Sequence, residues 1–339
     1  MSAIATTLPL AVSFDFLTAW GFWIGVLTFA AVYGIFTLGL QINVGYTGII
    51  NFGQAGFMAI GAYASVIFTV ELGLPMLLSL ALAILVAVIA GLLIGLPSLR
   101  LRADYFAIAT IAFSEIIRLT AQNARGLTGG NQGTIALELE QEEPVFFTDG
   151  WFEVSRSISD NILDPIGFTG TEFENLPLLL LAWILLVALV IVLNRLIRSP
   201  WGRVLRAIRE DEDAARALGK NAFGYKLQSL SIAAALGALS GWLLALQLQT
   251  VNQDAFDPIF TFIGYAILVL GGLASFAGVM VGSVVLWTIL EGMRFLDVGL
   301  GADKIAALRF ILVGLILILL MAFRPQGALG KREEMVLGD

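Results

Sequence analysis

The chain has no cysteine and no histidine among its 339 residues. Without cysteine it has no disulfide, no thiolate nucleophile and no ligand for an iron–sulfur cluster. Without histidine it lacks the usual general base, the Ser-His-Asp triad and the commonest metal ligand. These absences argue against an enzyme and predict that the chain carries no metal and no cofactor of its own.

Charged residues are scarce, at 13% of the chain, whereas 58% of the residues are hydrophobic and the mean hydropathy is +0.91. Soluble domains carry about 25% charged and about 45–50% apolar residues. The composition therefore indicates a membrane protein. The formal net charge of −7 argues against nucleic acid as a partner.

Long apolar runs hold most of the hydrophobic residues. A helix needs roughly 20 apolar residues to cross about 30 Å of hydrocarbon. Nine segments meet or approach this length, namely residues 17–40, 52–70, 75–96, 105–121, 177–193, 227–248, 259–273, 279–296 and 305–323. We therefore predict an all-α, polytopic membrane protein with about nine spans (8–10), forming a single transmembrane domain over residues 17–325.

Two polar stretches interrupt these runs, and their charges differ in sign. Residues 126–176 hold ten acidic residues and one basic residue, Arg156, whereas residues 195–226 hold eight basic and four acidic residues. Short loops rich in lysine and arginine stay in the cytoplasm. We therefore expect residues 195–226 to form a cytoplasmic loop and residues 126–176 to form an extracytoplasmic acidic segment.

The same charge rule predicts a cytoplasmic C-terminus, since Arg324, Lys331 and Arg332 follow the last apolar run. The N-terminus stays undecided. Nine spans place it outside, whereas a re-entrant segment near residues 41–56 places it inside.

Glycine is abundant, with 36 residues, many of them inside apolar runs. Small residues four apart let helices approach closely in lipid. Four pairs have this spacing, namely Gly21/Gly25, Gly91/Gly95, Gly237/Gly241 and Gly278/Gly282. We interpret these pairs as helix-packing sites.

Residues 41–56 are too rich in glycine for a regular helix, yet they lie between apolar runs. Irregular backbone at membrane depth is tolerated only where it is buried in protein or lines a cavity, and broken helices often line the substrate sites of transporters. We predict a broken or re-entrant segment here, with Asn43, Asn51 and Gln54 as candidate residues of a substrate pathway. The alternative is a packing seam. A fainter echo of Gly53-x-Ala55-x-Phe57 occurs at residues 272–276.

Glu115 and Arg118 are three residues apart in an otherwise apolar run, so they share a helix face. Charges inside the membrane are rare and mark functional sites by default. Glu115 is therefore a fourth candidate pathway residue, with an internal ion pair as the alternative. Glu291 and Arg294 repeat the spacing, and there we favour the ion pair.

The basic loop has the signals of an amphipathic helix. Ser199-Pro200 is a helix start, and Gly219 is placed to end the helix. Between them lie an apolar stripe and opposite-charge pairs four residues apart; the stripe consists of Val204, Leu205, Ile208, Ala215 and Leu218, and the pairs are Arg206–Glu210, Arg209–Asp213 and Glu212–Arg216. Mixed charge favours docking onto a protein partner over a helix that lies on lipid.

Within this loop, Asp213-Ala214-Ala215-x-x-x-Gly219 resembles the "EAA" loop of ABC importer permeases, with aspartate in place of glutamate. The wider run 199–219 resembles the branched-chain amino acid permease family, in particular its larger, M-type subunit. Further matches are Gly45-Tyr46-Thr47-Gly48, Phe52-Gly53-Gln54-Ala55, Leu127-Thr128-Gly129-Gly130 and residues 100–110 and 269–275. The resemblance covers roughly residues 40–325. The general pattern continues to a proline after Gly219 that this chain lacks.

The resemblance implies a permease subunit of an ATP-driven ABC importer, which moves branched-chain or other hydrophobic amino acids across the cell (inner) membrane by alternating access. It implies four kinds of partner: ABC ATPase subunits, a second homologous permease subunit, an extracytoplasmic substrate-binding protein and membrane lipid. No P-loop occurs in the chain, so ATP hydrolysis belongs to a separate chain.

The resemblance assigns Asp213, Ala214, Ala215 and Gly219 to the ATPase-coupling contact, and the charge pattern adds Arg206, Arg209, Glu210 and Glu212. Two alternatives stay open. Permeases for urea and short amides share much of the pattern. A secondary transporter or channel driven by an ion gradient would also account for Glu115, Arg118 and the broken segment.

Overall fold

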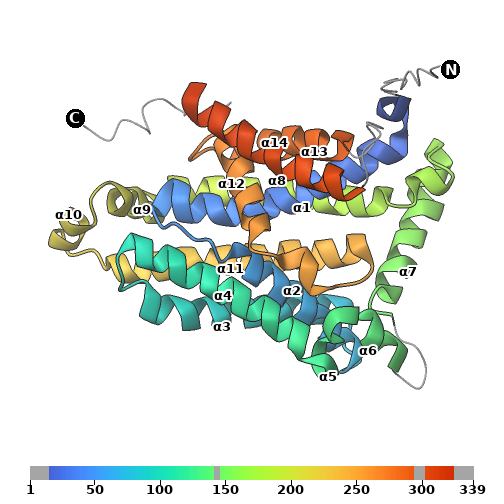
Figure 1. Cartoon of the computed structure of the whole chain (residues 1–339), viewed down its shortest axis with the longest axis horizontal. Helices are drawn as coiled ribbons and strands as arrows, with labels where there is room; N and C mark the ends of the chain where they lie inside the picture. Colours follow the sequence, from blue (N-terminus) through green and yellow to red (C-terminus); the bar gives the residue numbers. More distant parts are fainter. Residues whose placement is uncertain (1–14, 141–145, 294–301, 324–339) are drawn as a thin grey trace, which may run out of the picture.

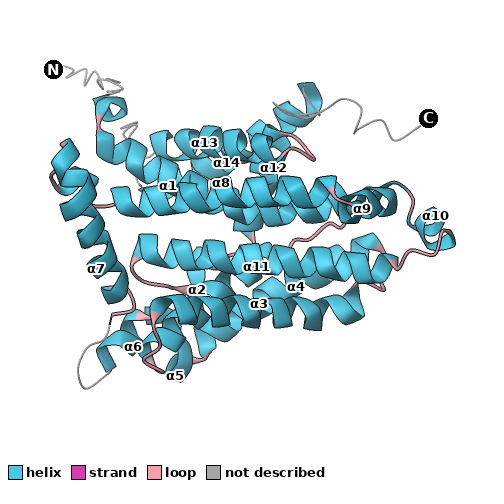
Figure 2. Cartoon of the chain, turned by 180° about the vertical axis from the view of Figure 1, so that it is seen from behind, coloured by secondary structure: helices cyan, strands magenta, loops and turns pink. Residues whose placement is uncertain are grey.

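The computed structural model describes residues 15–140, 146–293 and 302–323. Over these residues every regular element is a helix, and no strand occurs among them (Figure 2). Most long helices lie side by side along one axis, α12 crosses them, and short helices gather at the two ends of the bundle (Figure 1). The prediction of an all-α fold is confirmed for the described part of the chain.

The long helices are α1 (Trp20–Leu40), α2 (Gln54–Val70), α3 (Met76–Ser98), α4 (Ala103–Asn123), α8 (Leu176–Arg198), α11 (Ala222–Leu248), α12 (Ile259–Gly271), α13 (Phe276–Gly292) and α14 (Ala302–Phe323). At one end of the bundle lie the short helices α5 (Arg125–Thr128), α6 (Ile135–Glu140) and α7 (Asp149–Ile158). At the other end lie α9 (Pro200–Glu210) and α10 (Glu212–Ala217) (Figure 1).

Short 3-10 and π-helical turns complete the chain, namely η1 (Asp15–Thr18), η2 (Gln41–Thr47), η3 (Gly130–Gln132), η4 (Ser159–Leu163), η5 (Asp164–Ile166), η6 (Thr171–Phe173) and η7 (Gln253–Phe256). The π-helical turn η2 continues α1 directly, so that the two form one helix over Trp20–Thr47.

Four helical stretches in the described part are long and apolar enough to cross a membrane, namely Trp20–Thr47, Met76–Ser98, Thr171–Arg198 and Ala222–Leu248. Helices α12 and α13 meet this criterion together, but they are bent by 116° at their junction, so they add one span if they are counted as a pair. The structure thus has four to five candidate spans, and the nine predicted from apolar runs are not confirmed. The runs at 52–70 and 305–323 correspond to shorter apolar helices, and the run at 105–121 carries charge.

Helix α11 lies at the centre of the bundle, against α1, α2 and α3. Glycine allows the close contact with α2, because a Cβ atom on Gly241 would lie 1.9 Å from the carbonyl oxygen of Met58, and one on Gly61 would lie 2.2 Å from that of Ala238. The packing role predicted for Gly237/Gly241 is confirmed here. It is wrong within this chain for Gly21/Gly25, where an added Cβ would meet nothing within 4 Å.

The exposed faces of α3, α8 and α14 carry large aliphatic side chains. Leu93 is 67% exposed, Ile184 is 66% exposed and Ile318 is 66% exposed. Lipid tails favour such surfaces, whereas water does not. These three faces therefore have the composition of lipid-facing surfaces.

The acidic segment forms short helices at the end of the bundle opposite α9, where α7 crosses the ends of the long helices (Figure 1). Trp151 and Phe147 are buried there, together with one carboxyl group, Glu138, which is 2% exposed and accepts a hydrogen bond from the Phe147 amide at 3.3 Å. Burial raises the pKa of the Glu138 carboxyl above its ordinary value, and the negative charge of Asp149 acts in the same direction.

We expect these short helices to be more stable at acidic than at neutral pH. A carboxyl group whose pKa is raised by folding contributes stability below its unfolded pKa, and the contribution is lost as the pH rises through its folded pKa. Glu138→Gln keeps an acceptor for the Phe147 amide but removes the charge. The variant should resist proteolysis of this segment equally at both pH values, whereas the parent chain should be cut faster at neutral pH. An equal pH dependence in both proteins would contradict this assignment.

Candidate functional site

Helix α9 begins at Ser199, whose side-chain oxygen accepts a hydrogen bond from the Trp201 amide at 3.3 Å, and Pro200 occupies the first helical position. Its apolar face turns inward, with Leu205 and Ile208 buried. The sequence predicted this start and this buried face correctly.

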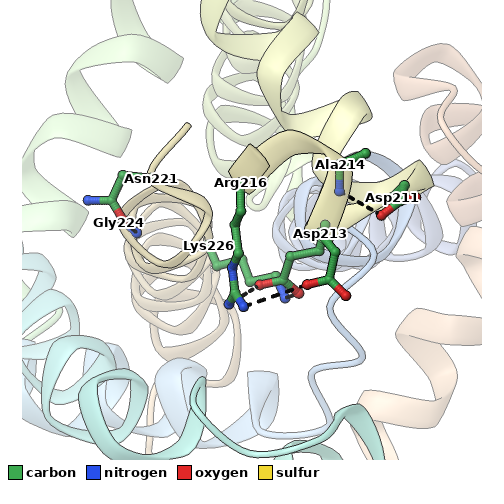
Figure 3. Close-up of polar contacts among 8 residues, drawn as sticks. Asp211, Asp213, Ala214, Arg216, Asn221, Gly224 and Lys226 are labelled. Atoms are coloured by element: carbon green, nitrogen blue, oxygen red, sulfur yellow. Dashed lines mark hydrogen bonds and ion pairs between the residues drawn. The ribbon is translucent and has the colours of Figure 1, made fainter. Parts of the chain in front are cut away.

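The predicted single helix is in fact two. Asp211 has an extended backbone (φ −152°, ψ 104°), and its carboxylate accepts a hydrogen bond from the Ala214 amide at 2.9 Å (Figure 3). Aspartate readily caps a helix in this way, so the chain ends α9 and starts α10 here. The break moves Asp213 off the turn that follows Arg209, and the predicted i,i+4 relation between these two residues no longer holds.

Glu212 ties α10 to α11. It accepts hydrogen bonds from Arg216 at 2.6 Å, as the sequence predicted, and also from Lys226 at the start of α11 (Figure 3). Lys226 was not expected to take part, because it is 14 residues away in the sequence. Arg206 and Glu210, also predicted to pair, form no ion pair in the described part of the chain.

The outer surface of α10 is open. Asp213 has a side chain that is 95% exposed, and Ala214 is exposed. Ala215 is 3% exposed and packs inward, whereas Leu218, expected on the same apolar stripe, is 80% exposed. The helix ends at Ala217, so Leu218 leaves the stripe and stands beside Gly219, whose φ of +78° lies in the left-handed region that favours glycine.

Arg209 points the other way, into the bundle. Its guanidinium donates a hydrogen bond to the carbonyl oxygen of Gly45 in η2. The chain turns at Gly48, where φ is +75° and a Cβ atom would lie 3.1 Å from the Arg209 Cγ. Arg209 therefore links α9 to the segment that interrupts the long N-terminal helix. This segment consists of η2 and the non-helical residues 48–53, and we call it the first break.

This first break confirms the prediction made from glycine content. Helix α1 and the π-helical turn η2 end at Thr47, residues 48–53 have no helical structure, and α2 begins at Gln54. Together with the start of α4, with α9 and with α11, the break borders a cavity of about 320 Å³ at the α9 end of the bundle. Its lining includes Thr47, Ile50, Arg102, Arg209 and Lys226.

The three polar candidates in the break are fully buried. Asn43 accepts a hydrogen bond from Ser229 at 2.9 Å, Asn51 caps the Gly53 amide at 2.8 Å and Gln54 donates to the Ala233 carbonyl at 3.0 Å. In this conformation Asn43 and Gln54 hold the break against α11, Asn51 stabilises the turn before α2, and none of the three lines the cavity.

A second break separates α12 from α13 at residues 272–275, where the sequence echo lies. The two breaks touch. The Tyr46 hydroxyl donates a hydrogen bond to the Ala274 carbonyl at 2.6 Å, and a Cβ on Gly45 would lie 3.1 Å from the Ala274 amide nitrogen. Ala274 has a φ of +57°, which is strained for a residue other than glycine.

Glu115 lies apart from the other candidates. It forms the predicted pair with Arg118, whose Nε lies 2.9 Å from a Glu115 carboxylate oxygen, and their side chains are 35% and 19% exposed. In the similar case of Glu291, Arg294 lies outside the described residues. Arg309 of α14 lies 3.3 Å from Glu291, a contact that sequence spacing could not predict.

The described residues thus form an exposed surface on α10, a link from α9 to the first break, and a contact between the two breaks. Over the described residues no cluster of acidic side chains could hold a metal ion. The arrangement is suited to transmitting motion between the surface and the membrane core.

Residues 22–321 match the family described as "Branched-chain amino acid transport system / permease component". The high-affinity branched-chain amino acid transport system permease protein LivM of Salmonella typhimurium is 35% identical over 327 residues, which are 95% of this chain and 73% of that protein. The LivM protein of Escherichia coli is 34% identical and covers 96% of this chain and 74% of its own length.

A probable branched-chain amino acid transport permease protein LivM of Methanocaldococcus jannaschii is 26% identical over 91% of this chain and 93% of its own length. No solved structure gives a significant match. The family match extends from α1 into α14, and two relatives exceed 30% identity over nearly the whole chain. The chain therefore belongs to the permease-component family of branched-chain amino acid transport systems.

Proposed function

We propose that this chain is a permease subunit of an ATP-driven ABC importer that moves branched-chain amino acids into the cell by alternating access. The family match and the transport systems of the LivM relatives support the substrate class. The single structural observation that carries the proposal is the pair α9–α10, which exposes Asp213 and Leu218 outward while Arg209 holds the first break inward.

The orientation follows from charge. The α9–α10 end carries the basic loop and faces the cytoplasm, whereas the described residues of the acidic segment, 126–140 and 146–176, lie at the opposite end, outside (Figure 1). About nine crossings of the cell (inner) membrane result if the four single candidate spans are joined by α2, α4, α14 and, counted separately, α12 and α13. The C-terminal cations, which lie outside the described residues, belong on the cytoplasmic side.

The partners divide along the same axis. ABC ATPase subunits dock on α10 and the turn after it, at Asp213, Ala214, Leu218 and Gly219. Ala215, Arg209 and Glu212 fix α10 and α9 to the bundle. Arg206 and Glu210 border the docking surface on α9. A substrate-binding protein docks at the outer end, lipid covers α3, α8 and α14, and a second homologous permease completes the path. ATP is hydrolysed on the separate ATPase chain.

Leu218→Asp should abolish recovery of the ATPase with this chain while leaving its insertion unchanged. An exposed leucine is a typical anchor for a partner pocket, and a carboxylate there would be desolvated without compensation. The measurement is quantitative mass spectrometry of the partners that co-purify from native membranes in mild detergent.

Leu127→Asp is the matched control, since Leu127 is 53% exposed at the opposite end of the bundle. Recovery of the ATPase in wild-type and Leu127→Asp preparations, with loss in Leu218→Asp, supports the proposal. Wild-type chain that is recovered without any P-loop ATPase, and still competent for uptake without ATP, would overturn it.

A further inference from the structure

Helix α4 has an exposed face that differs from the lipid-like faces of α3, α8 and α14. Its exposed side chains recur at helical spacing, namely Tyr105, Ile108, Ala112, Ile116, Leu119 and Asn123, and the ion pair Glu115–Arg118 lies on the border of this stripe. Glu115 is twelve residues, or about 18 Å, from the start of α4, which places it within the membrane if α4 crosses it as proposed above. Partly exposed charges at such depth face water or protein and not lipid.

The opposite face of α4 covers the first break. The Thr110 hydroxyl accepts a hydrogen bond from the Phe52 amide at 3.0 Å. The Phe52 ring stacks on Phe262 at 5.2 Å between centroids and meets Tyr265 at 5.0 Å. The Tyr265 hydroxyl in turn donates to the Asn51 carbonyl at 3.0 Å. Three aromatic rings from the break and from α12, which we call the aromatic cluster, therefore sit beside α4.

Polar groups lie on the outer side of the aromatic cluster. Arg118 lies within electrostatic range of Asp254 and Asp257, which belong to η7 and the turn before α12. A guanidinium has five N–H donors, and the pair with Glu115 uses two of them, so donors remain for a further anion. This outer mouth thus combines a cation with free donors, two carboxylates and the exposed apolar side chains Ile259 and Phe262.

The cavity of about 320 Å³ borders the start of α4 at Arg102, Ala103 and Phe106, before Thr110 along the helix. The start of α4 contributes Arg102 to it, and the break contributes Ile50, which is 38% exposed. Along α4 the order is therefore a charged mouth, three aromatic rings and a polar cavity. A hydrophobic constriction between two polar spaces is a recurrent form of gate.

We propose that the flank of α4 that carries Glu115 and Arg118, between its exposed stripe and the face that covers the first break, lines the path of the substrate, and that Phe52, Phe262 and Tyr265 form its closed gate. The substrate is an apolar amino acid in its zwitterionic form. Its carboxylate meets Arg118, its ammonium meets Asp254 or Asp257, and its side chain passes the aromatic cluster. This inference rests on the proposed function, since a second permease subunit closes the path on its far side.

Single cysteines test the path directly, because the chain has none of its own. Ile108 on α4 and Ile184 on α8 are a matched pair, 63% and 66% exposed. Ile108 lies seven residues before Glu115, on the same side of α4. A membrane-impermeant methanethiosulfonate cation is applied from both sides to the complete complex in proteoliposomes, with and without ATP. We expect Ile108→Cys to react at least about tenfold faster than Ile184→Cys in one nucleotide state, because a thiol ionises only where water reaches it.

Leucine supplied with the binding protein should slow this reaction at Ile108→Cys. Equal rates at the two positions, whether fast or slow, would overturn the proposal. Phe262→Ala tests the gate, since its loss should raise leucine leakage without ATP by about tenfold over wild type. Phe168→Ala, in the acidic segment, should leave leucine leakage unchanged. Equal leakage in both variants would contradict the assignment of the aromatic cluster as the gate.

These outcomes are separable from failure of the proposed function. Wild-type complex that accumulates leucine with ATP, but whose Ile108→Cys variant never reacts, contradicts only the path along α4. Wild-type complex that carries no amino acid with ATP contradicts the proposed function itself, whatever the labelling pattern.

Discussion

Arg209→Ala is expected to lower ATP-driven amino acid uptake by roughly 5- to 150-fold, the range of a typical coupling free energy between two sites. Arg209 joins α9 to the first break by donating to the Gly45 carbonyl, and its side chain packs on the turn at Gly48. The first break contacts the second through Tyr46 and Ala274. Removing the guanidinium should therefore uncouple the movement of α9 from both breaks.

The ATPase subunits should stay bound to the Arg209→Ala variant and continue to hydrolyse ATP, since Arg209 points away from the docking surface on α10. Arg203→Ala is the matched control, because Arg203 is an exposed arginine on the same helix. Uptake is measured in proteoliposomes beside ATP hydrolysis. An equal loss of uptake in both variants, or loss of the ATPase from the Arg209→Ala complex, would assign Arg209 to docking instead of transmission.

Gly241→Ala is expected to destabilise the folded chain by about 3 kcal/mol or more, which is the upper part of the range for overpacked cores. The added Cβ would lie 1.9 Å from the Met58 carbonyl oxygen and 3.0 Å from the Ala62 amide nitrogen. These backbone atoms cannot move without separating α2 from α11, and α11 is the central helix. We expect loss of monodisperse protein in detergent and a large fall in the thermal unfolding temperature.

Gly25→Ala is the control for this substitution. It has the same GxxxG spacing, but a Cβ at Gly25 meets nothing within 4 Å. The variant should match the parent chain or gain up to about 1 kcal/mol from better helix propensity. Similar destabilisation in both variants would show that the contact with Met58 is not the cause.

The two glycine pairs show that the spacing of residues along a helix does not predict which neighbour they contact. Gly21/Gly25 and Gly237/Gly241 have the same spacing in similarly apolar helices, yet only the second pair faces a neighbouring backbone in this chain. Spacing along a helix fixes which residues share a face, but it does not say what that face meets. The helix break at residues 48–53 was predictable because glycine acts on the local backbone itself.

Local and distant contacts differ in the same way on the cytoplasmic side. The cap at Ser199 and the pair Glu212–Arg216 follow from short sequence separations. The bond from Arg209 to Gly45 spans 164 positions, and that from Lys226 to Glu212 joins two helices, so no periodic pattern contains them. Leu218 is exposed because α10 ends at Ala217, whereas the sequence predicts one helix that continues to Gly219.

The role of the polar candidates within the membrane stays a prediction, although the structure shows where their side chains lie. Polarity at depth marked Asn43, Asn51 and Gln54, and all three lie at the first break. Whether such a side chain faces a cavity depends on the helix opposite, and here α11 supplies Ser229 and Ala233 as partners. The predicted span count is not confirmed for a related reason, since apolar content does not separate a bent pair such as α12–α13 from two crossings.

The most direct test of the proposed transport function is amino acid uptake by the complex that co-purifies with this chain, reconstituted in proteoliposomes with its binding protein outside and ATP inside. Leucine, isoleucine and valine should accumulate only with ATP, and urea and short amides should not. Accumulation of urea would leave the permease role intact and replace the substrate. Uptake by this chain alone, without ATP and abolished by an ionophore, would contradict an ABC importer and make Glu115 and Arg118 the site of ion coupling.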